Sequence, residues 1–187
     1  LKNNSDFIEF SAKINNKTKN HKLQAVLVLN ENVEKTVSED AIGVIERKID
    51  YNYNIQKYMP ALRPKELKTN FFPMQRFVCA NNGIFVTKGL NEYEVYKNEL
   101  KICLLRAFST ISNPKNPARA IPAGPNLETP EAQCLGENSA EFCVSFGNYK
   151  KAYKIAEEFY KNYVVIDGEF KQEINLKLAQ IPANTLI

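Results

Sequence analysis

The sequence predicts a mainly β protein, built from antiparallel hairpins with one late helix. Several segments alternate apolar and polar residues with the period of two that is typical of a strand with one buried face. Turn-forming clusters rich in Asn and Gly separate these segments. A chain of 187 residues that is 44% hydrophobic supplies one ordinary core, so we expect a single domain over residues 1–187.

The expected strands follow one another along most of the chain. They cover residues 8–14, 23–29, 42–49, 76–80, 84–87, 93–96, 100–109, 142–146 and 170–178. The polar turn at residues 15–20 predicts that the first two strands form a hairpin. Residues 100–109 are apolar on both faces, which predicts a strand that lies between two layers.

Residues 149–163 have the period of an amphipathic helix, and Asn148 is suited to cap its start. An aromatic stripe on one face of this helix favours docking on a sheet over a ligand platform.

Two other segments lack periodicity. Residues 51–67 contain Pro60 and Pro64, which predicts a surface crossing. Residues 112–138 hold five of the nine prolines, and a loop of this length is typically functional or an interface.

Composition disfavours several classes of protein. Lys and Arg exceed Asp and Glu by only four charges, and the lysines are scattered, which disfavours nucleic acid as a partner. Apolar runs fall far short of the ~20 residues that a membrane helix needs, so we expect no membrane partner. The four cysteines lack C-x-x-C spacing, which favours reduced, structural thiols and a cytoplasmic location. The chain begins at Leu1 without a signal segment, so we expect a processed start or a piece cut from a longer protein.

His21 is the single histidine, and this restricts the possible chemistry. Ser-His-Asp catalysis would need His21 as its base, no G-x-S-x-G motif is present, and one histidine cannot build a His-rich zinc centre. A hydrogen-bonded structural role is the favoured interpretation of His21. Glu128 and Glu131 are the most suggestive close pair of carboxylates for glycosidase chemistry. Solvation or turn capping is the favoured interpretation of both.

Three arginines are informative because each can make planar two-point contacts. Arg106 lies in an apolar run, and an ion pair with a nearby glutamate is its expected role. Glu46 and Arg47 are neighbours in a strand, so their side chains should point to opposite faces and form no salt bridge with each other. Arg119, in the proline-rich loop, is better placed to face a ligand or a neighbouring domain.

The order and spacing of a set of segments over residues 7–147 resemble the C-terminal β-rich region of α-mannosidases of glycoside hydrolase family 38. The similarity is to the bacterial branch that includes mannosylglycerate hydrolases. The matching segments are residues 15–23, 44–47, 72–78, 88–95, 104–106, 119–125 and 129–136. Departures exist, because Asn20 stands where the family has aspartate, and Lys22 and Gln24 stand where it has arginine. From about residue 149 the similarity is only in general character.

The resemblance implies a sandwich of the galactose-mutarotase-like type that follows a catalytic barrel absent from this chain. It further implies a parent enzyme that hydrolyses α-mannosides with retention, with zinc held by that missing N-terminal catalytic domain. No position here matches the family's nucleophile or zinc ligands, so we expect no catalytic residue, metal site or cofactor in the chain itself. Arg119, Glu131 and Gln133 are the candidate substrate-binding residues, as hydrogen-bonding groups at the pocket rim. An equally weighted alternative is that their motif only shapes the loop.

Two other functions stay open at the level of sequence. The chain could be a free-standing carbohydrate-binding β-sandwich, in which case Arg119 would contribute to saturable sugar binding. It could also be a sugar epimerase with His21 as acid or base, which rests on analogy of fold alone.

Overall fold

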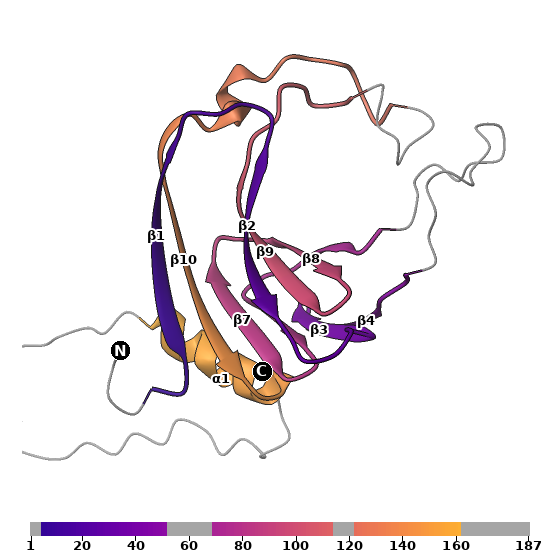
Figure 1. Ribbon diagram of the computed structural model, residues 1–187, viewed down its shortest axis with the longest axis vertical. Coiled ribbons are helices and arrows are strands. Elements are labelled where there is room, and N and C mark those ends of the chain that lie inside the picture. The colour runs from indigo at the N-terminus through magenta and orange to yellow at the C-terminus, as the bar shows by residue number, and fades with distance from the viewer. Residues whose placement is uncertain (1–4, 52–68, 114–121, 162–187) are drawn as a thin grey trace, which may run out of the picture.

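The structure is a computed structural model that describes residues 5–51, 69–113 and 122–161. These residues form two antiparallel sheets and one α-helix, which confirms the predicted mainly β fold (Figure 1). The six-stranded sheet has the order β1-β10-β7-β6-β3-β4, and the four-stranded sheet has the order β2-β9-β8-β5. The bounds are β1 Ile8–Asn16, β2 Lys22–Val28, β3 Lys35–Glu39, β4 Val44–Lys48, β5 Phe71–Pro73, β6 Phe77–Ala80, β7 Gly83–Lys88, β8 Glu92–Tyr96, β9 Glu99–Arg106, the 3-10 helix η3 Pro130–Gln133, β10 Gly136–Phe146 and α1 Tyr149–Tyr160.

The main core lies between the two sheets. Alternation along each strand sends one set of apolar side chains inward, where they meet across the sandwich. Its buried members are Leu29, Val33, Met74, Val78, Ala80, Phe85, Tyr93, Val95, Leu100, Ile102 and Phe142. Tyr93 is fully buried, and its hydroxyl shares a 2.7 Å hydrogen bond with the hydroxyl of Thr36 from the other sheet. A buried phenol needs such a partner, so this bond aligns β8 with β3.

Helix α1 covers the opposite face of the six-stranded sheet and forms a third layer (Figure 1). The side chain of Asn148 caps its start by accepting a 3.1 Å hydrogen bond from the backbone N–H of Lys151, as predicted. The small residues Ala152 and Ala156 are buried, together with Ile155, and let the helix lie close to β6 and β7. The prediction that this face docks on a sheet is therefore confirmed. The helix ends at Tyr160, before the predicted residue 163, because Lys161 is extended.

The predicted hairpin of the first two strands is wrong. Strand β1 pairs with β10 in one sheet, and β2 pairs with β9 in the other, so the chain crosses between the sheets after Asn16. Figure 1 shows this crossing at the top of the molecule. A polar turn predicts that the chain reverses but does not choose the partner of the next strand. Here β10 offers β1 a continuous register from Ile8 opposite Val144 to Asn16 opposite Gly136.

Two further strand predictions need correction. The strand expected at 42–49 is shorter, β4, because Ile42 lies fully exposed in the turn before it. Strand β4 forms a hairpin with β3, a strand that the sequence did not predict. Strand β3 escapes the apolar pattern because its buried side chains include Thr36 and Ser38. The strand expected at 100–109 ends at Arg106, and only alternate residues are deeply buried, so it has one buried face. The surface crossing at 51–67 and the strand at 170–178 lie outside the described residues apart from Tyr51.

The expectation for neighbouring charges in β4 is confirmed. Arg47 donates to Asp40 at 2.7 Å and to Ser38 at 2.5 Å, whereas Glu46 accepts from Lys35 at 2.8 Å. The two side chains therefore lie on different faces of the hairpin.

No helix within the described residues is long and apolar enough to cross a membrane.

Candidate functional site

Segments that carry the family resemblance meet at one end of the sandwich, which we call the η3 end and define as residues 16–22, 106–112 and 128–135. Lys22 at the start of β2 lies opposite Arg106 at the end of β9. The backbone N–H of Ala107 donates to the carbonyl of His21 at 2.8 Å, and that of Phe108 donates to the carbonyl of Ala132 at 3.1 Å. These bonds tie together segments that are far apart in sequence.

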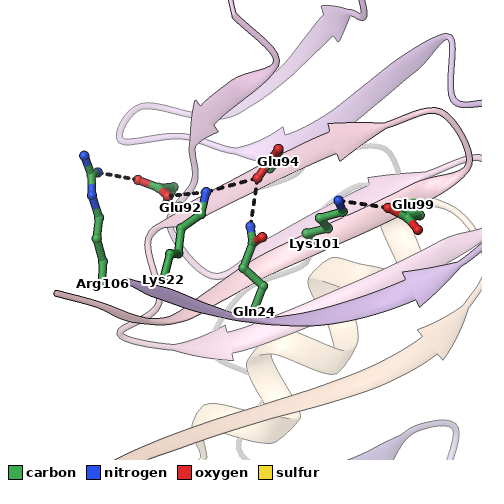
Figure 2. A network of polar contacts seen from close by, with 7 residues as sticks. All are labelled: Lys22, Gln24, Glu92, Glu94, Glu99, Lys101 and Arg106. Atoms are coloured by element: carbon green, nitrogen blue, oxygen red, sulfur yellow. Dashed lines mark hydrogen bonds and ion pairs between the residues drawn. The ribbon is translucent and has the colours of Figure 1, made fainter. Parts of the chain in front are cut away.

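A network of charged side chains continues from this end over the outer face of the four-stranded sheet, and we call it the outer charged network (Figure 2). Lys22 donates to Glu94 at 3.0 Å and lies 3.8 Å from Glu92, which also accepts from Arg106 at 2.8 Å. Gln24 donates to the same oxygen of Glu94 at 2.9 Å. Further along β9, Lys101 pairs with Glu99 at 2.8 Å. The network arises because alternation places polar residues of three adjacent strands on one face.

Exposure differs sharply within this network. The side chain of Lys101 is only 17% exposed and that of Glu94 is 20% exposed, whereas that of Arg106 is 62% exposed. The predicted ion pair between Arg106 and a glutamate is confirmed, but it lies at the surface, where such a pair contributes about 0–1 kcal/mol. Arg106 is therefore free to exchange Glu92 for an incoming acceptor at little cost.

Gln133 is 4% exposed, and its amide is engaged by the β1–β2 connection. Its side-chain oxygen accepts from the backbone N–H of Asn20 at 2.8 Å, and its nitrogen donates to the side-chain oxygen of Asn20 at 2.9 Å. Asn20 adopts a left-handed backbone with φ of 54°, which Asn tolerates better than most residues. The side chain of Asn16 donates to the carbonyl of Gln133 at 2.9 Å. Gln133 thus holds the crossing between the sheets.

The other candidate substrate-binding residues are placed differently. Glu131 is exposed in η3 and can reach a partner from the surface. Glu128 is also exposed and forms an isolated β-bridge with Thr110. Arg119 lies outside the described residues. Glu131 and Gln133 both lie in η3, where Glu131 is exposed and Gln133 is buried.

Two buried polar atoms at the η3 end lack a hydrogen-bond partner among the described residues: Nδ1 of His21 and Oγ1 of Thr129. The backbone carbonyl of His21 accepts from the N–H of Ala107. Because its buried Nδ1 has no partner among these residues, the predicted hydrogen-bonded role of the His21 side chain is not confirmed. No group of three or more His, Cys, Asp or Glu side chains in the described ranges is arranged to hold a metal ion.

All four cysteines are free thiols, as expected. Cys79 and Cys143 are buried beneath α1, and burial raises the pKa of each thiol to about 12. Cys103 lies on the outer face, where partial burial and then the charge of Glu92 raise its pKa. Raised pKa values disfavour the reactive thiolate, which agrees with a structural role.

Sequence reasoning missed two features of this end. The hydrogen bonds between Asn20 and Gln133 join positions 113 residues apart, and no local sequence pattern predicts such a contact. The outer charged network did leave a signal, because Glu92 and Glu94 alternate with the buried Tyr93 and Val95. That alternation predicts acidic side chains on the outer face of β8. It does not identify their cationic partners, which come from β2 and β9.

This chain is similar to part of several larger known proteins. No family model matches it. A protein of Halalkalibacterium halodurans named "Putative mannosylglycerate hydrolase" is 36% identical over 75 residues, which cover 38% of this chain and 7% of that protein. Two solved structures from Enterococcus faecalis match 81% of this chain. One is a protein in glycosyl hydrolase family 38, with 23% identity and a TM-score of 0.58, and the other is an α-mannosidase, with 24% identity and a TM-score of 0.59.

The share of each relative that is matched is small. The chain spans 17% and 16% of the two solved chains. At these identities the structural likeness establishes the fold, and the curated relative adds a likeness in sequence. The resemblance seen in the sequence is therefore confirmed: the chain is similar in fold, and over part of its length in sequence, to the β-rich region of family 38 glycoside hydrolases.

Proposed function

We propose that this chain is a non-catalytic C-terminal β domain of an α-mannosidase-like glycoside hydrolase. The parent enzyme would hydrolyse α-mannosides with retention in the cytoplasm, and its N-terminal catalytic domain would hold the zinc. The observation that carries the proposal is the convergence at the η3 end of several segments that resemble the family. Support comes also from the small share of each relative that the chain matches.

The η3 end and the outer charged network supply the chemistry of a polar interface. Lys22 and Arg106 donate hydrogen bonds, and Glu92 and Glu94 accept them, so the surface complements a partner of mixed charge. Low exposure of Glu94 and Lys101 means that their geometry is fixed before any partner arrives. A preorganised surface loses less conformational entropy on docking.

Within this proposal the three candidate residues have separate roles. Glu131, exposed on η3, would hydrogen-bond a sugar hydroxyl or brace a barrel loop at the pocket rim, and Arg119 would do the same from the proline-rich loop. Gln133 would position that loop rather than touch substrate, because its amide is engaged with Asn20. We assign no proton transfer to this chain, because in this proposal the parent's nucleophile would lie in the catalytic barrel.

The proposal is tested by expressing the chain together with the coding region upstream of Leu1 as two separate polypeptides. The chain alone should release no mannose from an aryl α-mannoside with zinc present, whereas the pair should co-purify and show zinc-dependent activity. Combined Lys22→Ala and Arg106→Ala changes should weaken co-purification at least tenfold. Lys35→Ala is the matched control, because Lys35 is 60% exposed and pairs with Glu46 away from the η3 end.

Three outcomes would overturn the proposal. Turnover by the chain alone would place catalysis here. Absence of an upstream coding region would remove the parent enzyme. Saturable mannose binding by the isolated chain in calorimetry, lost on Arg119→Ala, would instead establish a free-standing carbohydrate-binding module.

A further inference from the structure

The edge of the six-stranded sheet at β1 carries an inference that is independent of the proposed function. Strand β1 is the outermost strand of this sheet and pairs with β10 on one side (Figure 1). Among the described residues, no strand pairs with its other side. An edge strand of nine residues presents backbone donors and acceptors that can pair with a further strand.

The hydrogen-bonding pattern of the sheet shows which residues of β1 direct their backbone groups to this edge. The N–H of Gly147, just beyond β10, donates to the carbonyl of Asn82 at 2.7 Å and extends the register of β10 with β7. Because hydrogen-bonded and non-hydrogen-bonded positions alternate, odd-numbered residues of β10 bond to β7 and even-numbered ones bond to β1. Each even residue of β10 lies opposite an even residue of β1. The odd residues of β1 therefore direct their N–H and C=O groups to the edge, and they are Glu9, Ser11, Lys13 and Asn15.

The side chains of β1 form one apolar and one polar face. Phe10 stacks on the core residue Phe142, with ring centroids 5.0 Å apart, so the even-numbered side chains lie on the face toward the four-stranded sheet. This apolar face is only partly covered, because Ile8 and Phe10 are 49% and 43% exposed. The odd-numbered side chains of β1 are polar and lie on the opposite face. A strand that pairs with this edge should therefore have the same two faces.

We propose that β1 pairs antiparallel with β1 of a second copy of this chain, so that the two six-stranded sheets form one continuous sheet. The two-fold axis passes beside Ser11, which lies opposite Ser11 of the second copy, and residues 8–14 of each copy form the contact. An axis perpendicular to the sheet keeps the apolar faces of both copies on the same side. The outer charged network lies on the other sheet, so this pairing leaves it accessible.

Charge selects this register. With Ser11 at the axis, Glu9 of each copy lies opposite Lys13 of the other, which gives two pairs of opposite charge within hydrogen-bonded positions. An axis at Glu9 or at Lys13 would place two like charges directly opposite each other. An axis at Phe10 or at Ala12 would place neither Glu9 nor Lys13 opposite a residue of the other sign. A lysine on an edge strand opposes most pairings, and here one register matches it with a glutamate.

The apolar face is complementary in the same register. Phe10 lies opposite Ala12 of the second copy, so its ring meets a small side chain. Ile8 lies opposite Ile14 of the second copy. These are non-hydrogen-bonded pairs, in which facing side chains come closest together. Pairing therefore removes exposed surface of Ile8 and Phe10 from water, which favours the dimer.

The test exchanges charges between two variants of the full chain, and sedimentation equilibrium measures the dimer. The unchanged chain should dimerise in a concentration-dependent way. Glu9→Lys and Lys13→Glu should each raise the dissociation constant roughly tenfold or more, because each places like charges opposite one another at both pairs. Mixing the two variants should restore a dimer in which a tagged copy of one retains the other. Lys17→Glu is the matched control for Lys13→Glu, because Lys17 is exposed but lies outside residues 8–14, and it should leave the dissociation constant unchanged.

A disulfide between two chains locates the axis by a second measurement. The background carries Cys103→Ser and Cys134→Ser, which remove the two partly exposed cysteines. On it, Ser11→Cys should form a disulfide between two chains, because facing Cα atoms of a hydrogen-bonded pair are about 5.5 Å apart, within the range of a disulfide. Asn15→Cys, on the same face of β1, should form none, because it lies opposite Phe7 of the second copy in this register.

Three outcomes would overturn the proposal. A chain that sediments as a monomer at every concentration would show that β1 does not pair with a second copy. A dimer that is equally stable with Glu9→Lys, and that the mixture of variants does not restore, would place the contact elsewhere on the molecule. A disulfide through Asn15→Cys in place of Ser11→Cys would exclude the register with Ser11 at the axis.

Discussion

The two sheets differ in what lies on their outer faces. The six-stranded sheet is covered by α1, and residues beneath the helix, such as Phe77, Ile84 and Val86, are fully buried. The four-stranded sheet has no such layer among the described residues, and its outer face carries charges beside exposed Val26 and Tyr96. Each sheet also contributes its inner face to the common core.

Two arginines, Arg76 on the covered face and Arg106 on the uncovered face, show the same difference between the sheets. Arg76 binds both oxygens of Glu39, at 2.7 and 2.6 Å, and also contacts Glu157 on α1. Its side chain is 24% exposed, and these partners raise its pKa, chiefly through the hydrogen bonds to Glu39. Arg106 pairs with Glu92, and its side chain is 62% exposed. On the covered face, Arg76 links the six-stranded sheet to α1. On the uncovered face, the exposed Arg106 remains accessible to a partner.

The largest effect is expected for packing under the helix. Phe77→Ala should lower the free energy of unfolding by about 3–5 kcal/mol, because it opens a cavity between α1 and β6. Val26→Ala, at a position 48% exposed on the other sheet, should change it by less than about 0.5 kcal/mol. Urea unfolding followed by circular dichroism measures both. Similar losses would mean that the outer face of the four-stranded sheet is covered in solution.

Carboxylates on the two faces should also differ. Glu39→Ala leaves Arg76 without its two-point partner and should cost about 2 kcal/mol of stability. Glu92→Ala removes a partner from the exposed Arg106 and should cost less than about 1 kcal/mol. Thermal unfolding of the two variants at equal salt gives the comparison, and a larger loss for Glu92→Ala would reverse our assignment of roles.

Alkaline pH should weaken the covered face through its thiols. An ordinary thiol pKa lies near 9, and burial raises the pKa of Cys79 and Cys143 to about 12. Between these values the unfolded chain loses protons that the folded chain retains, so stability falls as pH rises above 9. From pH 8 to 10.5 the two thiols should contribute a loss of about 1–2 kcal/mol each. A Cys79→Ala, Cys143→Ala variant should show a smaller decline in urea midpoint over the same range.

The smallest effect on stability is expected at Arg106. Arg106→Ala should change the free energy of unfolding by less than about 0.5 kcal/mol, because the pair with Glu92 is exposed and screened. Salt should have little further effect on this variant. A loss above 1 kcal/mol in denaturant titration would show that Arg106 stabilises the isolated fold and is not held in reserve for a partner.

Strand existence was predictable from the sequence, but strand partnership was not. The alternation over residues 8–14 locates β1, because one side must be wet and the other dry. Its partner β10 lies more than a hundred residues away, and only the folded register from Ile8 to Asn16 selects it. Strand β3 was missed for a related reason, since Thr36 is buried through a hydrogen bond to Tyr93 that no local pattern contains.

The candidate site was predictable in part. The proline-rich motif identified Glu131 and Gln133 together, but spacing alone could not separate an outward side chain from an inward one. That separation follows from Asn20, whose left-handed backbone brings its N–H and side chain within reach of the amide of Gln133. The cationic half of the outer charged network was hidden because Lys22 and Arg106 become neighbours only when β2 pairs with β9.

The crossing from β1 to β2 has a consequence for the order in which the chain folds. Strand β1 is synthesised before the other described strands, yet it pairs with β10 only after more than a hundred further residues have been made. The hydrogen bond between Asn16 and Gln133 likewise joins positions 117 residues apart. Contacts of such high order slow folding, because the loop must be closed before its contacts form. During synthesis β1 is therefore an exposed strand awaiting a late partner, and its polar outward residues protect it from premature association.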